Sequence, residues 1–408
     1  MSSPSLILPS SLSFFSSPPS SSPPITSSSS PPSSPYLLPS ISSLLPLILP
    51  YIPSWSSNSP SSIEISRLTG FSNLVFKLSN NDPTVSPKCL IYREYLSSNT
   101  FVTRQQEQLI FNYLSSTRLG PKNLGGNQIF RLEEFVFGTH PSSPQMNCRE
   151  MMVWMARALA KLHKLKIEGV ELKKEEGPKM RKELEKGYFV RGFEKRWDEI
   201  GGSMGETERE RMRNMYDVVQ EERSWIMERL PGEEGVVFCH NDLCANNIFI
   251  REEGEGVDQV VLIDFEYAGY NYRAYDIANF FNETTFDYSN CETPFFFHSM
   301  KDYPDDHKMK EFAAFYLFFS KTKDQDQKTW EGSIFEKTGD NIIEEMGPEF
   351  KEEVEVLVQE IKVCILFSLM YWMMWSGANC KNEKIDFDYI QHGYDRMTMY
   401  KSLKERFF

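Results

Sequence analysis

Two short polar segments that directly follow apolar runs constrain the fold of this chain more than any other feature. The run VVFC leads into His240 and Asp242, and the run VVLI leads into Asp264. Short apolar runs of this kind are typical of buried β-strands, and side chains at strand ends are held rigidly enough to meet at a cleft. The sequence therefore predicts a site in which two strands bring carboxylates together.

The spacing within these segments indicates phosphoryl transfer. His240, Asp242 and Asn247 have the H-x-D-x-x-x-x-N spacing of a kinase catalytic loop, and Asp264 follows in the place of the metal-binding Asp of D-F-G. The reaction needs one carboxylate to orient the acceptor hydroxyl and take its proton, and oxygen ligands for Mg²⁺. We predict Asp242 as the base, with Asn247 and Asp264 as Mg²⁺ ligands. Either motif alone could be a chance turn or strand cap, but both occur in the expected order behind β runs.

The composition changes near residue 62 and divides the chain into a tail and a folded part. Before Glu64 the sequence is almost entirely Ser, Pro and Leu and has no charged side chain. Such a segment cannot form a packed core, so we expect residues 1–60 to be a disordered tail that acts as a spacer. Residues 61–140 are β-rich and are expected to form a nucleotide-binding N-lobe. Residues 141–408 are mostly helical and are expected to form the catalytic and substrate-binding C-lobe, which gives an α+β fold class with two lobes.

Two apolar segments are candidates for membrane spans. The run Leu44–Ile52 is interrupted by Pro46 and Pro50 and is far shorter than the roughly 20 residues of a spanning helix. The helix expected over residues 352–378 is polar at its start, and we expect it to be buried. No membrane span is therefore predicted. The first basic residue is Arg67, so we expect no secretory leader.

Charge and cysteine content indicate the compartment and the kind of partner. The net charge of −13 comes without a basic stripe, so nucleic acid and anionic membrane are poor partners, whereas a cationic small molecule is compatible with it. The seven cysteines lack C-x-x-C pairs, which predicts a reduced, cytoplasmic protein with neither a disulfide framework nor a zinc site. The sequence does not determine the oligomeric state, and a homodimer is one assembly compatible with it.

The stretch from Phe238 to Glu283 resembles the choline/ethanolamine kinase family. CHNDLCANNI and IDFEYAGYNYRAYDIANFFNE are similar to the family texts C-H-N-D-L-x-x-x-N-I and I-D-F-E-Y-x-x-Y-N-Y-R-x-Y-D-I-A-N-x-F-N-E. The resemblance extends over residues 63–408 and implies a two-lobed protein-kinase-like fold. It also implies transfer of the ATP γ-phosphate to choline or ethanolamine. Phosphorylation of choline is the first step of phosphatidylcholine synthesis. By the same similarity Glu266 and Glu283 belong near the active site.

The N-lobe carries the family's ATP-binding features in a modified form. Gly70, Ser72 and Asn73 resemble the turn G-G-x-S-N, in which backbone N–H groups can cover ATP phosphates, although one glycine is missing. Arg93 resembles the family Arg that replaces the Lys of protein kinases, and Glu107 resembles the helix Glu that pairs with it. A solvated surface charge is the alternative for both of these residues.

The amine pocket is expected to be aromatic, because a quaternary ammonium cannot donate hydrogen bonds. Trp372 and Trp375 are three residues apart and share one helix face. They coincide with the family's W-x-x-W, although two tryptophans in an apolar helix could also be core residues. Tyr288 matches a family tyrosine that faces the amine.

One wall of this pocket departs from the family. His392 stands where a further family tyrosine is expected. This wall therefore lacks its tyrosine unless Tyr389 or Tyr394 supplies it. His392 could accept a hydrogen bond from a primary ammonium, and IDFDY at Ile385–Tyr389 resembles ethanolamine kinases. The segment FDYSNCETPFFFHSMKDYP resembles choline kinases, and we therefore expect choline to be preferred.

Three alternatives to a choline kinase remain open from the sequence: an ethanolamine kinase, a phosphotransferase of the aminoglycoside type, and a scaffold without activity. The second would share the catalytic loop but not the paired tryptophans, and the third is disfavoured because Asp242 and Asp264 are both present. Two further polar residues are expected to be structural. His163 lies on a patterned helix, and Asp276 is expected to brace the catalytic loop through hydrogen bonds.

Overall fold

The computed structural model describes eleven segments of the chain, namely residues 39–56, 60–68, 73–95, 104–117, 119–167, 178–200, 204–252, 259–301, 303–323, 334–380 and 386–408. Residues from Ser40 to Phe408 belong to one compact unit. The predicted tail up to residue 38 lies outside the described residues, as do Gly70 and Ser72 of the phosphate-binding turn.

The N-lobe is built on an antiparallel sheet of five strands in the order β1-β2-β3-β5-β4. Leu78, Leu90 and Leu132 are fully buried on one of its faces, because side chains two apart on a strand share a face. The strands and the helix that accompanies them are β1 (Ile63–Leu68), β2 (Asn73–Asn80), β3 (Cys89–Tyr95), α2 (Arg104–Thr117), β4 (Asn123–Gly126) and β5 (Phe130–Glu134).

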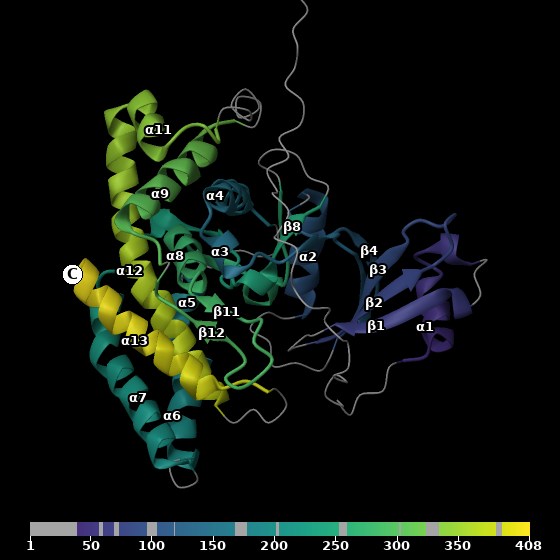
Figure 1. Ribbon diagram of the computed structural model, residues 1–408, viewed down its shortest axis with the longest axis horizontal. Coiled ribbons are helices and arrows are strands. Elements are labelled where there is room, and N and C mark those ends of the chain that lie inside the picture. The colour runs from purple at the N-terminus through teal and green to yellow at the C-terminus, as the bar shows by residue number, and fades with distance from the viewer. Residues whose placement is uncertain are drawn as a thin grey trace, which may run out of the picture. The chain divides into compact units, whose positions relative to one another are not determined.

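Part of the expected tail is folded, which corrects the predicted boundary at residue 60. Helix α1 (Ile41–Ile48) begins at Ser40, whose side chain accepts a hydrogen bond from the backbone N–H of Ser43 at 3.1 Å. Its apolar residues and those just after it bury against the sheet, and Figure 1 shows α1 beside β1. The buried side chains of this segment are Leu44, Ile48, Ile52 and Trp55.

Two hydrogen bonds between residues far apart in the sequence hold this segment against the N-lobe. Trp55 Nε1 donates to the carbonyl of Pro87 at 2.8 Å, and Tyr51 donates through its hydroxyl to the carbonyl of Gly126 at 2.9 Å. Composition suggested disorder because Ser and Pro dominate, but apolar residues three and four apart make one face that the sheet can cover. Burial of these side chains outweighs the hydrogen bond that Pro46 removes from the helix.

The C-lobe is mainly helical, as predicted. The 32-residue α12 packs against α6, α8 and α13, and Figure 1 shows α13 running alongside it. The helices of the C-lobe are α3 (Ser143–Met146), α4 (Arg149–His163), α5 (Lys179–Lys186), α6 (Tyr188–Ile200), α7 (Glu206–Met227), α8 (Arg273–Glu283), α9 (Asp306–Lys321), α11 (Gly339–Met346), α12 (Pro348–Asn379) and α13 (Tyr389–Phe407).

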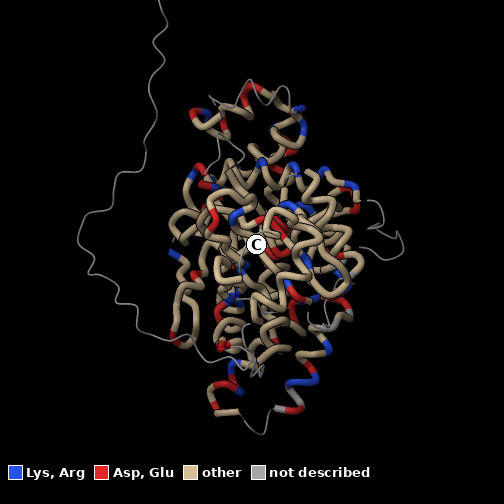
Figure 2. The backbone as a smooth tube through the Cα atoms, turned by 90° about the vertical axis from the view of Figure 1, so that its right-hand side faces the viewer, with Lys and Arg blue, Asp and Glu red and all other residues tan. Residues whose placement is uncertain are grey.

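Helix α12 is apolar nearly all round because it is the core helix of this lobe. By length and composition it is the one described helix that could cross a membrane, but 72% of its most apolar window is buried inside the protein. On the outside of the molecule Lys and Arg are interspersed with Asp and Glu along the described helices, as Figure 2 shows.

Short strands of the C-lobe bring the two polar segments together. β7 (Val236–Cys239) pairs with β10 (Gly269–Tyr272), and β8 (Ile248–Arg251) pairs with β9 (Val260–Leu262). β8 also pairs with β6 (Gly138–Thr139), at the junction of the two lobes. β7 and β9 belong to different sheets of the C-lobe, and each ends just before one of the two polar segments.

Candidate active site

The loop after β7 holds the predicted base and one predicted metal ligand in direct contact. Asn247 donates through Nδ2 to Asp242 Oδ2 at 2.9 Å and to the Asp242 carbonyl at 2.9 Å. The amide thus fixes the carboxylate and keeps its own oxygen Oδ1 for another partner. The second loop is attached here as well, because the N–H of Ile263 donates to the Asn247 carbonyl at 3.0 Å.

Two residues at the centre of the site have left-handed backbone conformations. Asn241 has a φ of 69° and Asp264 a φ of 61°. Asn and Asp adopt this region more readily than other residues with a side chain, at a cost that a well-packed surrounding must offset. Asp242 and the Asp264 carboxyl group owe their positions to these two turns of the chain.

Asp276 supplies the packing that holds the first of these turns. Its carboxylate accepts the backbone N–H of His240 at 2.8 Å and that of Asn241 at 2.7 Å. His163 contacts the same carboxylate through Nε2 at 3.1 Å, while its Nδ1 lies 2.9 Å from the Tyr316 hydroxyl. The predicted structural roles of His163 and Asp276 agree with this geometry. Cys239 lies close enough to them for a shared metal ion, but all three are buried and hydrogen-bonded within the protein.

The site is strongly acidic. Burial raises the pKa of the half-buried Asp242 well above its usual value, and the negative charges of Glu283, Asp264 and Glu266 raise it further. These four carboxyl groups include both glutamates that the resemblance placed near the active site. A divalent cation or an ammonium bound among them would favour the ionised form of Asp242, which is the form that can accept a proton.

On the N-lobe side, Arg93 has a different partner from the one expected. Its Nε lies 2.7 Å from Glu133 Oε1 on β5, whereas Glu107 lies 3.5 Å from Arg131. Arg131 also contacts Glu133 at 2.8 Å, so the four side chains form one network. The prediction that Glu107 pairs directly with Arg93 is therefore wrong, because the register of β3 and β5 places Arg93 opposite Arg131, beside Glu133.

This network faces the second polar segment across a small pocket. Burial alone would raise the pKa of Glu133, but the guanidinium groups of Arg93 and Arg131 outweigh it and lower the pKa to about 2. Glu133 therefore remains ionised and holds Arg93 in place. The pocket is lined by Arg93, Glu107, Phe111, Pro121, Arg131, Glu133, Ile263, Asp264 and Phe265.

Aromatic rings form a continuous wall on the C-lobe. Trp372 lies 5.4 Å from Trp375, which in turn lies 5.4 Å from Tyr389, measured between ring centroids. Tyr267 joins them, since its ring is 5.4 Å from Trp372 and its hydroxyl accepts from Trp375 Nε1 at 3.1 Å. Tyr267 was not predicted, although it directly follows Glu266 in the IDFEY text. Tyr394 stands apart, with its ring 5.1 Å from the Arg211 guanidinium.

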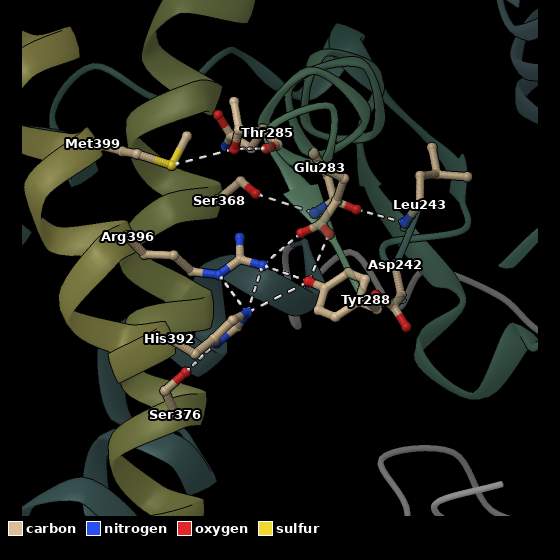
Figure 3. A network of polar contacts seen from close by, with 12 residues as sticks. Asp242, Leu243, Glu283, Thr285, Tyr288, Ser368, Ser376, His392, Arg396 and Met399 are labelled. Carbon is tan, nitrogen blue, oxygen red and sulfur yellow. Dashed lines mark hydrogen bonds and ion pairs between the residues drawn. The ribbon is translucent and has the colours of Figure 1, made fainter. Parts of the chain in front are cut away.

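Tyr288 connects this wall to a buried ion pair, shown in Figure 3. Its hydroxyl donates to Glu283 Oε2 at 2.9 Å, and Glu283 Oε1 lies 2.6 Å from Arg396 Nη2. Arg396 also donates to His392, which contacts Ser376 on α12. Sequence reasoning missed Arg396 and Ser376, although Arg396 is one helical turn after His392.

Solved structures share this architecture. A choline kinase from Cryptosporidium parvum superposes with a TM-score of 0.70 at 22% identity, over 90% of this chain and 95% of that chain. An ethanolamine kinase from Plasmodium vivax gives a TM-score of 0.60 at 21% identity, over 87% and 89% of the two chains. Fold and site together define a protein of the kinase-like class, with two lobes and a kinase-type catalytic loop.

Sequence comparison identifies the family within this class of proteins. Residues 65–401 match the family described as choline/ethanolamine kinase. A choline/ethanolamine kinase of Homo sapiens is 27% identical over 352 residues, covering 85% of this chain and 81% of that protein. A probable ethanolamine kinase of Arabidopsis thaliana is 27% identical over 375 residues, covering 88% and 87%. The chain belongs to the choline/ethanolamine kinase family and is an ATP-dependent kinase of small molecules.

Proposed function

We propose that this kinase transfers the γ-phosphate of ATP to choline and releases phosphocholine and ADP. The observation that supports the proposal best is the position of Asp242 within a cluster of carboxylates that also contains Glu283, whose partner Tyr288 packs against the rings of Phe286 and His392. Asp242 orients the choline hydroxyl and accepts its proton as the oxygen attacks phosphorus. Asn247 holds the Asp242 carboxylate in the orientation that this step needs.

The nucleotide is expected between the two loops and the N-lobe. Asn247 Oδ1 and the Asp264 carboxylate are hard oxygen donors of the kind that Mg²⁺ prefers, and they would hold the ion. An ion held there would neutralise the phosphate charges. Arg93, fixed by Glu133 on the opposite side of the pocket, is placed to bind phosphate oxygens. Asn73 begins β2 and, with Gly70 and Ser72, remains a predicted contact to the phosphates.

The aromatic wall favours choline as the acceptor. Trp372, Trp375, Tyr389 and Tyr288 offer ring faces, which attract a quaternary ammonium without hydrogen bonds. Ethanolamine is the second candidate, because Glu283 carries carboxylate oxygens that a primary ammonium could donate to. The relative from Arabidopsis thaliana named as a probable ethanolamine kinase also keeps that candidate open.

An ADP-release assay with choline, ethanolamine and an aminoglycoside tests the proposal. We expect kcat/KM to be highest for choline. Asp242→Asn should lower kcat by about a thousandfold or more while ATP still binds, because the base is lost but the metal ligands remain. Turnover of Asp242→Asn within about tenfold of wild type would exclude this role for Asp242. Faster turnover of the aminoglycoside than of either amine would exclude the proposed substrate class.

A further inference from the structure

His392 and Arg396 form a buried pair on α13, with the His392 ring beside those of Trp375 and Tyr288. Their exposed fractions are 2% and 1%. Arg396 donates to His392 Nε2 from both Nε, at 3.2 Å, and Nη2, at 3.0 Å, and the same Nη2 lies 2.6 Å from Glu283 Oε1. His392 is thus one of three acceptors of the guanidinium, together with Glu283 and the Tyr288 hydroxyl at 3.4 Å, as Figure 3 shows.

The contacts of His392 define its tautomer. A guanidinium can only donate hydrogen bonds, so Nε2 of His392 must be an unprotonated acceptor. The neutral ring therefore carries its hydrogen on Nδ1, which donates to Ser376 Oγ at 2.8 Å. Burial lowers the pKa of His392 well below its usual value, and the positive charge of Arg396 and the nearby His298 lower it further. Both ring nitrogens are then engaged within the protein.

This arrangement changes what the pocket can offer to a substrate. A primary ammonium has three N–H groups that need acceptors, and His392 has no lone pair left for them. The charge of Glu283 is balanced by Arg396, and one of its oxygens accepts the Tyr288 hydroxyl. What remains beside His392 are the aromatic rings of Tyr288 and Trp375, which suit a methylated ammonium.

Arg396 depends on His392 and Glu283, because its contact with the Tyr288 hydroxyl is longer, at 3.4 Å. Its Nη1 is buried and has no hydrogen-bond partner in the described part of the chain. Its guanidinium carbon lies 4.4 Å from the Phe286 ring centroid, a contact that restricts it to one plane but does not fix its direction. Without His392, the guanidinium would keep Glu283 as its one charged anchor.

We propose that His392 is a positioning residue that fixes Arg396 on Glu283 and thereby makes the pocket selective for a quaternary over a primary ammonium. The inference rests on the proposed choline kinase activity and deepens it. It also reverses the interpretation drawn from sequence, in which His392 itself could accept a hydrogen bond from a primary ammonium. In the structure that lone pair serves Arg396 instead.

The test compares two substitutions at the same position. His392→Leu removes the acceptor and keeps the bulk, whereas His392→Gln keeps an acceptor oxygen near the place of Nε2. In His392→Leu we expect the choline-to-ethanolamine ratio of kcat/KM to fall about tenfold, through a higher KM for choline with kcat little changed. His392→Gln should restore most of that ratio. Thermal melting of both variants shows whether each is folded.

Three results would overturn the inference: an equal loss for both substrates in His392→Leu, no restoration in His392→Gln, or a wild-type preference for ethanolamine. An independent readout is the ¹⁵N spectrum of histidine-labelled protein, with the His392 signals assigned by their loss in His392→Gln. We expect a neutral Nδ1–H ring that does not titrate between pH 6 and 8. A titrating ring, or hydrogen on Nε2, would contradict the inference even if neither amine were a substrate. Absence of turnover with both amines would instead refute the proposed function.

Discussion

Asp242 combines two properties that a general base in this site needs. It is oriented by Asn247, and it is surrounded by carboxylates that raise its pKa. A raised pKa makes the ionised group a stronger base, but it also makes the free enzyme sensitive to acid. With Asp242 as the proposed base, we expect its proton affinity to set the lower pH limit of activity.

We expect kcat/KM for choline to fall about tenfold per pH unit on the acid side, with a midpoint above the ordinary Asp range. The sign follows from the shift: Asp242 becomes protonated at a higher pH than a solvated Asp, and the protonated form cannot accept the hydroxyl proton. Glu266→Gln should move the midpoint to lower pH, because it removes one of the charges that raise this pKa. A pH–rate profile of both proteins is the measurement. A midpoint that moves upward in Glu266→Gln would contradict the assignment.

Residues that belong to one local motif could be predicted from the sequence. Residues whose partners come from a distant segment of the chain could not. Asp242 and Asn247 lie five residues apart in one loop, so a motif could identify both. Glu133 and Arg131 join the Arg93 network only because β3 pairs with β5 in a particular register. Arg396 was missed for the same reason, since its partner Glu283 is on another helix.

At the scale of elements, α1 shows how composition can mislead. The segment before residue 60 has the Ser and Pro content of a disordered chain, yet its apolar side chains recur at helical spacing from Leu44 to Ile52. The sheet order of the N-lobe leaves one face for it to cover, and this could not be known before the strands were paired. The strands and long helices themselves were predicted, because their periodicity is local.

Truncation tests the role of α1. A chain that starts at Ser40 should melt like the full protein, whereas a chain that starts at Pro60 should lose several kcal/mol of unfolding free energy, because it uncovers the apolar face of the sheet. Differential scanning calorimetry measures both.

A pair of point variants tests the packing of this segment without changing the length of the chain. Trp55→Ala should cost about 3 to 5 kcal/mol, the usual range for a buried Trp. Leu47→Ala, on α1 and 45% exposed, should cost less than about 0.5 kcal/mol. Equal melting temperatures for the two variants would mean that the segment from α1 to Trp55 does not pack on the sheet.

Across the whole molecule, positive groups of the N-lobe face negative groups of the C-lobe. Arg93 and Asp264 line the same pocket, and the negative charge of Asp264 favours the charged form of the Arg93 guanidinium. Asp242 lies among further carboxylates, and the negative charges of Glu283, Asp264 and Glu266 raise its pKa. Ligands that bring positive charge should therefore stabilise the fold as well as bind.

We expect ATP to raise the melting temperature strongly with Mg²⁺ and weakly after its removal with EDTA. At a hundred times the Kd, binding contributes about 2.7 kcal/mol. Asp264→Asn should reduce the Mg²⁺-dependent part, because the amide is a weaker ligand, and Asn tolerates the left-handed backbone at this position. Thermal shift measurements provide the comparison. An ATP effect of the same size with and without Mg²⁺ would exclude a metal site formed by Asp264.

The bonds from the Asp276 carboxylate to the amides of His240 and Asn241 have a consequence for the way activity is lost. Asp276 is fully buried on α8, which packs against the core helix α12. Those two amide hydrogens can exchange with solvent only when α8 separates from the loop that carries Asp242. Catalytic competence is thereby tied to the cooperative opening of the helical core rather than to local fraying, so the enzyme should lose activity abruptly, with the unfolding of this lobe.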